Sequence, residues 1–396
     1  MSVRSARKCS WRGRWLGGGV FLLALVGISA CPPEPEGEVP DPVPSEVDCE
    51  SIYMRPGHGE TFYENNPTYL DRTDDTSSWT FSTPEAEGMD PAILAEGVRE
   101  LEESPSLFGF ILIRHDAIVL ERYFNGSGPH QSNNVHSASK SILSALVGIA
   151  LREGFLSSLD EAVASILPEY FRGENDDFVK KQISLFHLLT MTTGLFWVED
   201  ETEYEIEETE DWIASILAQP MVHLPGRTFN YSTGASHVTS ALLTRATGMD
   251  TCTFAHRYLF GHLGITAEHW GRDPQGYFSG GYNLYLTARE LAKFGLLYLH
   301  EGRWEALQVV PESWVTDSLT RQTGVDIQYD YGFYWWLTRV QGYDLSTAWG
   351  YGGQFIHLLP ELDIVVVFTA NTRNEYDELD SIRFIRNHIL PAVETE

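Results

Sequence analysis

Residues 136–154 read HSASKSILSALVGIALREG. Ser137 and Lys140 stand three positions apart at the start of a segment that is apolar nearly all round, which predicts a buried helix. Residues three apart on a helix share a face, so the Lys140 amine can approach the Ser137 hydroxyl. A serine becomes an effective nucleophile when a base removes its proton. A partly desolvated lysine has the lowered pKa that such a base needs.

The same pair has a simpler interpretation, in which Ser137 only caps the helix and Lys140 is an exposed charge of its first turn. The Ser-x-x-Lys pattern also occurs at residues 5–8, where no catalysis is expected. The motif alone therefore leaves both interpretations open.

Composition excludes some classes of protein. The chain has 396 residues, 43% of them hydrophobic, which suffices for a large core. Its formal net charge is -29, and no Lys/Arg cluster occurs beyond residue 14. Nucleic acid and anionic membrane surfaces are therefore not expected as partners of the folded part.

The N-terminus predicts export. A basic segment precedes the short apolar run 20–28, and the run ISAC ends at Cys31. It resembles a bacterial lipobox, so we expect a lipoprotein signal at 1–30 and lipidation of Cys31. Ordinary cleavage after Ala30 is the alternative. The expected location is the bacterial cell envelope, lipid-anchored and facing the periplasm from the outer membrane, or the secreted fraction. The lipid anchor would be the only contact with the membrane.

Residues 31–75 begin with a proline- and acid-rich run and are predicted to be a tether. Residues 76–396 are predicted to form one globular domain. Export implies an oxidising compartment, in which Cys49 and Cys252 either pair or remain separate thiols.

Hydrophobic patterns predict the order of the elements. A helix begins at Asp90-Pro91, a hairpin turns at His115-Asp116, and a buried helix follows at 141–154. Helical patterns dominate from about 160 to 300, strands return at 331–340, 352–360 and 363–370, and a helix closes the chain at 381–390. This order predicts an α+β sandwich. Both chain ends would share one antiparallel sheet flanked by helices, with a mostly helical lobe inserted between them.

Further segments resemble the serine β-lactamase and penicillin-binding-protein superfamily, on the class C side that includes esterases and 6-aminohexanoate-dimer hydrolases. The resemblance runs from about residue 80 to the C-terminus. Besides Ser137-Ala138-Ser139-Lys140, it rests on ISLFHLLTMTTGL (183–195), LPGRTFNYSTG (224–234), GGYNLYLTARELAKFG (280–295) and WGYGGQ (349–354).

The resemblance implies roles for individual residues. Ser137 would form an acyl-enzyme, and Lys140 and Tyr231 would share the proton transfers, with the base at each step left open. A lysine ammonium nearby would help Tyr231 to ionise. The oxyanion hole would be the backbone N–H groups of Ser137 and Tyr351. No metal or cofactor is implied.

Two departures from the family pattern bear on the substrate. Ala348-Trp349-Gly350 stands where the family has Lys or His at the first position, and Thr233 replaces the usual Asn. Thr233, Trp349, Gly350 and Gly352 would face the substrate, with the glycines permitting its close approach. The expected substrate is a small ester or linear amide. The alternatives are a DD-peptidase or β-lactamase, and a non-catalytic binding module.

The run EDETEYEIEETED (199–211) holds nine acidic residues in thirteen. It is interpreted as a solvated loop, with a lid over the cleft or a weak Ca²⁺ site as alternatives. Its charge would discourage anionic substrates. The oligomeric state is left open.

Overall fold

The computed structural model describes residues 38–44, 47–50, 52, 69–71, 79–199, 201–267, 269–372 and 379–393. The predicted signal segment and Cys31 lie outside these residues. Within the described ranges, no helix combines the length and apolarity needed to cross a bilayer.

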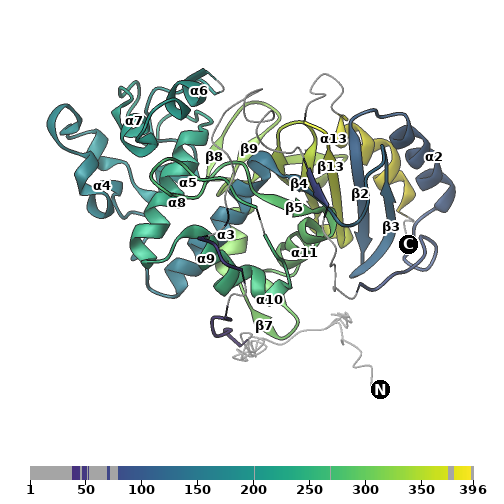
Figure 1. The fold of residues 1–396 in the computed structure, drawn as a ribbon. Coiled ribbons are helices and arrows are strands. Elements are labelled where there is room, and N and C mark those ends of the chain that lie inside the picture. Colours follow the sequence, from purple (N-terminus) through teal and green to yellow (C-terminus); the bar gives the residue numbers. More distant parts are fainter. Residues whose placement is uncertain are drawn as a thin grey trace, which may run out of the picture. The chain divides into compact units, whose positions relative to one another are not determined.

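The main sheet joins the two ends of the domain, as the sequence predicted (Figure 1). Its order within the described residues is β3-β2-β13-β12-β11-β10-β9-β8, and each neighbouring pair is antiparallel. The strands are β2 (Leu107–Arg114), β3 (Ala117–Tyr123), β8 (Thr323–Gly324), β9 (Asp330–Tyr331), β10 (Trp336–Val340), β11 (Tyr343–Gly350), β12 (Gln354–Leu359) and β13 (Ile364–Ala370).

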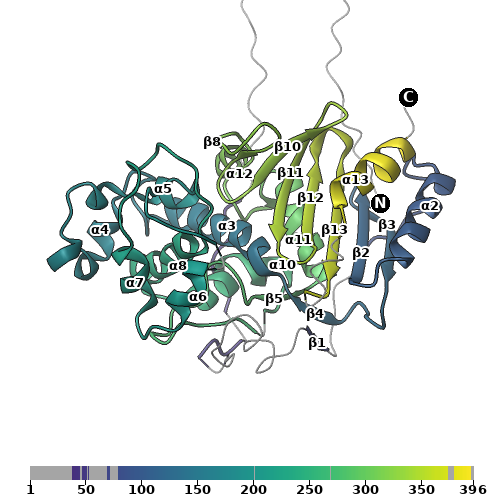
Figure 2. The same cartoon turned by 90° about the horizontal axis from the view of Figure 1, so that it is seen from above.

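The sheet is buried on both faces, and β2 shows how. Phe110 and Leu112 pack on the side of α2 (Pro91–Glu102), α13 (Ser381–Phe384) and η8 (Ile385–Ile389). Ile111 and Ile113 face the core built with α3 (Ser139–Arg152) and α11 (Ala288–Leu299). This alternation makes the three layers seen in Figure 2.

The local signals at the N-terminal end hold. Asp90 Oδ1 accepts from Ala92 N at 2.7 Å and caps α2, with Pro91 in the first turn. The β2–β3 turn is at His115 and Asp116, whose φ angles are 49° and 64°. Left-handed residues at both central positions match the twist of a tight hairpin.

The inserted lobe packs on α3, and its helix α8 makes this contact (Figure 1). Apart from short 3-10 turns, its helices in the described residues are α4 (Val163–Ile166), α5 (Leu185–Leu189), α6 (Glu201–Glu207), α7 (Trp212–Ala218), α8 (Thr233–Thr247), α9 (Thr251–Ala255), η5 (His256–Phe260) and α10 (Gly261–Leu263). Outside it are α12 (Glu312–Ser318), a small sheet of β1 (Tyr69–Asp71), β4 (Gln131–Asn134) and β5 (Tyr285–Thr287), and the pair β6 (Arg303–Trp304) and β7 (Leu307–Gln308).

The strand prediction for 331–340 is wrong in its middle. The chain leaves the ladder after β9 and re-enters at β10. Between them, Phe333 N donates to Ser318 O and Tyr334 N to Leu189 O, both at 3.2 Å. The break lets Phe333, Tyr334 and Trp335 enter the core beside the helices. Burying these three rings stabilises the fold more than continuing the strand through them would. The sequence also did not separate β11 as a strand of its own.

Candidate active site

Ser137 lies in a one-turn helix, η1 (His136–Ala138), that leads directly into α3. His136 just before it has a φ of 45°, a left-handed conformation that turns the chain at this point. The turn is held by Asn134, whose Oδ1 accepts from His136 N at 3.0 Å. Ser137 remains half-buried, at the point where the turn meets the buried helix.

Lys140 is in the first turn of α3 and is only 1% exposed. Its Nζ donates to Ser137 Oγ at 2.7 Å, to Thr233 Oγ1 at 2.9 Å and to Gly281 O at 3.1 Å. Burial lowers the pKa of Lys140 to about 8, although the negative charges of Glu199 and Glu203 oppose the shift. The amine is therefore close enough to the serine to take its proton, and it is partly neutral near pH 7.

Tyr231 precedes α8, and its side chain interacts with that of Ser137. Lys140 Nζ lies 5.0 Å from the centre of its ring. Burial, and then the charge of Glu199, raise the pKa of Tyr231 well above its usual value, although the Ser137 hydrogen bond lowers it. The expectation that the lysine helps this tyrosine to ionise is therefore wrong. Tyr231 is a phenol at neutral pH, able to donate its hydrogen.

The acidic run 199–211, whose charge predicts a solvated loop, contains a helix, α6, because Thr202 and Ile206 bury one of its faces. Glu199, just before α6, reaches Thr233: it accepts from Thr233 N at 3.0 Å and from the Thr233 hydroxyl. At the far end of α6, Glu207 accepts from the Tyr282 hydroxyl, and burial raises the pKa of Glu207 to about 8.

The end of β11 abuts the turn that carries Ser137. A Cβ on Gly350 would lie 2.2 Å from Val135 O, so only glycine allows this approach. Gly352 has a φ of 71°, and a Cβ there would lie 2.9 Å from the Cα of Thr372. Tyr351 between them is 44% exposed. Its ring centre lies 5.6 Å from that of His136.

An aromatic wall borders Tyr231. Trp336 on β10 stacks on Tyr231 with ring centres 5.6 Å apart, and Trp349 on β11 lies 5.5 Å from Trp336. Tyr329 contacts both tryptophans. Trp336 and Trp349 are half-buried, whereas Ala348 is fully buried. The structure thus brings Ser137, Lys140, Tyr231, Thr233 and the end of β11 to one place, with Trp349 in the wall beside Tyr231.

A family model described as Beta-lactamase matches residues 98–388. The chain belongs to the β-lactamase family. The 6-aminohexanoate-dimer hydrolase of Paenarthrobacter ureafaciens is 25% identical over 322 residues, which are 70% of this chain and 79% of that protein. Family and relative make this chain a serine hydrolase of the β-lactamase fold, which confirms the resemblance drawn from the motifs.

Solved structures agree on the fold. A candidate 6-aminohexanoate-dimer hydrolase from Bacillus anthracis superposes with a TM-score of 0.66 at 17% identity, covering 89% of this chain and 100% of that one. A penicillin-binding-protein homologue from Caulobacter crescentus gives 0.62 at 15% identity, covering 79% and 99%. The predicted sandwich architecture is confirmed by this likeness.

Several residues around the site of this β-lactamase-family protein were missed from the sequence. Asn134 and Asn283 bond to each other through their side chains at 2.9 Å, which joins the turn that carries Ser137 to the segment carrying Gly281. Gly281 places its carbonyl on Lys140, and a Cβ there would lie 3.0 Å from Nζ. Glu199 was seen only as part of an acidic run. No periodic pattern marks these residues, because their partners are distant in the chain.

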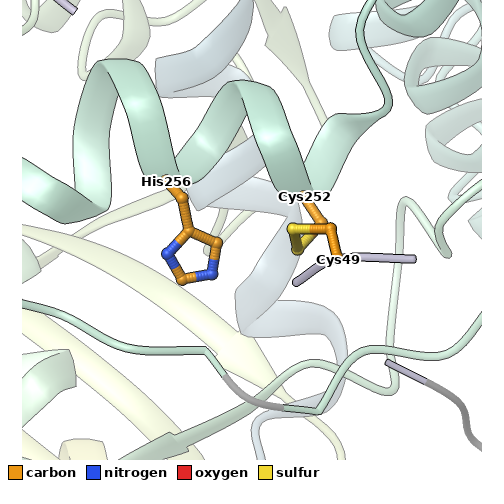
Figure 3. Close-up of side chains that lie close together, drawn as sticks. All are labelled: Cys49, Cys252 and His256. Carbon is orange, nitrogen blue, oxygen red and sulfur yellow. A yellow bond between two sulfur atoms is a disulfide. The ribbon is translucent and has the colours of Figure 1, made fainter. Parts of the chain in front are cut away.

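Cys49 and Cys252 are joined by a disulfide, with Cα atoms 5.9 Å apart (Figure 3). His256 lies beside them, with a ring nitrogen and the two sulfur atoms within 4.8 Å of one another. The sulfurs bond to each other and so do not offer thiolate ligands to a metal. The bond fastens Cys49, which lies within the predicted tether, to α9. Val43 N also donates to Arg257 O, and Gln308 N to Glu38 O, so this part of the tether lies against the domain.

Proposed function

We propose that this protein is an exported hydrolase that cleaves an ester or a linear amide through an acyl-enzyme at Ser137. The observation that carries the proposal is the 2.7 Å contact between Lys140 Nζ and Ser137 Oγ, made by an amine whose pKa is lowered to about 8. In its neutral form Lys140 takes the serine proton as Oγ attacks the carbonyl carbon. This acylation step needs no other nucleophile.

The remaining groups would serve the other steps. The backbone N–H groups of Ser137 and Tyr351 would receive the oxyanion, since the Gly350 contact holds the two segments together. Tyr231, a phenol at neutral pH, would pass a proton to the leaving group. Water would then release the acyl group from Ser137 by the reverse sequence of proton transfers.

Charge and shape around the site favour a neutral or cationic substrate with an apolar part. Ala348 offers no cation to a substrate carboxylate, and the charges of Glu199 and Glu203 reach Lys140. An anionic group would be repelled by these carboxylates. The wall of Trp336 and Trp349 would hold an apolar chain or ring. The Paenarthrobacter relative is named a hydrolase of the 6-aminohexanoate dimer, which supports the linear-amide branch because two amino acids condense through an amide.

The proposed location is the bacterial cell envelope, with Cys31 lipidated, or the secreted fraction. The Cys49–Cys252 disulfide supports an oxidising compartment. If the proposal holds, Cys31→Ser moves the protein from the membrane fraction to the soluble fraction. Unchanged partition would contradict lipidation.

The decisive experiment is intact-protein mass spectrometry after incubation with a fluorophosphonate, a penicillin and a short-chain aryl ester, with Ser137→Ala as control. A fluorophosphonate adduct on the wild type and none on Ser137→Ala is expected, together with turnover of the ester. Turnover of the penicillin in place of the ester would favour a penicillin-recognising enzyme. A folded wild-type protein that gains no adduct would refute the hydrolase and favour a binding module.

A further inference from the structure

We propose that Glu199 is a positioning residue that acts through Thr233 to turn the lone pair of Lys140 toward Ser137. The inference rests on the proposed function, because it concerns how the base of that reaction is oriented. It assigns a task to one member of the acidic run and explains why a threonine serves at position 233.

Lys140 Nζ lies within hydrogen-bond distance of Ser137 Oγ at 2.7 Å, Thr233 Oγ1 at 2.9 Å and Gly281 O at 3.1 Å. An ammonium carries three hydrogens and donates one to each. A neutral amine carries two hydrogens and one lone pair. One of the three oxygens must then face the lone pair, and catalysis requires that it be Ser137 Oγ.

The two other oxygens are restricted to accepting. Gly281 O is a carbonyl and has no hydrogen. The Thr233 hydroxyl has one, and it is donated to Glu199 Oε1. Since neither group can donate to Nζ, the neutral amine donates its two hydrogens to Thr233 Oγ1 and Gly281 O. Its lone pair is left facing the Ser137 hydroxyl.

Glu199 is itself held in place. Its Oε2 accepts from Thr233 N at 3.0 Å and from the indole of buried Trp197. Trp197 in turn receives a hydrogen bond on its carbonyl from Asn230 Nδ2 at 3.0 Å. With both oxygens bonded, the carboxylate has a defined orientation before substrate arrives, as positioning groups require.

The step balances without another reagent. Ser137 Oγ–H breaks and its proton joins the Lys140 lone pair, while Oγ bonds to the substrate carbonyl carbon. The carbonyl electron pair moves onto its oxygen. Lys140 is then an ammonium with three donors again, and it can return the proton in a later step.

A carboxylate is needed at residue 199 because an amide has one oxygen and cannot accept from both Thr233 N and the Thr233 hydroxyl. In Glu199→Gln, the oxygen can accept from Thr233 N only if the NH₂ group points at Thr233 Oγ1. The NH₂ then donates to that hydroxyl and frees its hydrogen. The Thr233 hydroxyl can then donate this hydrogen to the Lys140 lone pair. The lone pair no longer faces Ser137 and cannot take its proton.

The negative charge of Glu199 has a second effect, on the pKa of Lys140. Its loss would change the rate in the opposite direction to the loss of orientation, so the two roles can be told apart. The charged and titratable groups acting on Lys140 are Glu199 and Glu203 from the α6 segment, His136 from the turn that carries Ser137, and the ring of Tyr231. Removing the Glu199 charge lowers the pKa of Lys140 and increases its neutral fraction at pH 7. A purely electrostatic role therefore predicts a faster reaction at low pH and an unchanged rate at high pH.

The test is kcat/KM for a neutral aryl ester, and the rate of fluorophosphonate labelling, from pH 6 to 10 with the full chain. The variants are Glu199→Gln, Thr233→Val and their combination, with Glu205→Gln as a control that removes an exposed carboxylate of α6. We expect Glu199→Gln to lower the high-pH plateau about tenfold while its midpoint moves to lower pH. Glu199→Gln should add little in the Thr233→Val background, and Glu205→Gln should match the wild type.

Two results would overturn the inference: an unchanged plateau in Glu199→Gln, or full additivity of the two substitutions. Thermal unfolding of each variant checks the fold. Should Glu199→Gln not fold, the comparison of Thr233→Val with Thr233→Ser decides, since only the serine keeps a hydroxyl for Glu199 to orient. Equal plateaus in these two variants would also refute it. A wild-type chain that is not labelled at Ser137 would refute the proposed function instead.

Discussion

The rate of acylation should follow the titration of Lys140. The test varies the pH from 6 to 10 and leaves the chain unaltered. With a pKa of about 8, about a tenth of the lysine is neutral at pH 7 and about nine-tenths at pH 9. If the neutral amine is the base, kcat/KM rises roughly tenfold between these values and then levels off. The direction follows from the chemistry, because only the deprotonated amine can accept the serine proton.

The assay is the initial rate with a neutral aryl ester, corrected at each pH with Ser137→Ala for spontaneous hydrolysis. A parallel measurement of fluorophosphonate labelling isolates the attack by Ser137 from later steps. A rate that is flat from pH 6 to 10 would refute Lys140 as the base. A rate that still rises at pH 10 would instead point to the phenolate of Tyr231, whose pKa is raised well above its usual value.

Two further predictions concern the framework of the site. Gly350→Ala places a Cβ about 2.2 Å from Val135 O and must displace β11 or the turn that carries Ser137; a shift of about 1 Å lowers kcat/KM about 100-fold. Gly128→Ala, where a Cβ meets nothing within 4 Å, should keep full activity, and equal rates for both variants would contradict the close approach. Cys252→Ser opens a disulfide that spans 203 residues, for which the loop-entropy relation sets a loss of unfolding free energy of at most about 5 kcal/mol. Thermal unfolding should show a lower Tm, and identical melting of oxidised and reduced protein would contradict a stabilising role.

Local sequence patterns predicted much of the architecture. The hairpin at His115-Asp116, the Asp90 cap and the buried helix after Ser137 each depend on residues a few positions apart, so their periodicity and turn chemistry predict them. The spacing of Ser137 and Lys140 is equally local, because the helix itself sets their distance. The sharing of one sheet by both chain ends followed from the order of the elements.

Other features depended on tertiary structure. The pattern of 331–340 reads as one strand, yet packing of its aromatic rings into the helical core breaks it. Tyr231 looked easier to ionise beside a lysine, but burial and a carboxylate raise its pKa. Such shifts depend on how completely the site excludes water, which the sequence does not state.

The local sequence was enough to predict that Ser137 and Lys140 lie within reach of each other, and to predict the layers that surround them. The surroundings of the pair depend on tertiary contacts, because Thr233 and Gly281 contact Lys140, and Glu199 contacts Thr233, from segments far from Lys140 in the chain. A helix sets the spacing of its own residues, whereas contacts between distant segments depend on the packing of the whole domain.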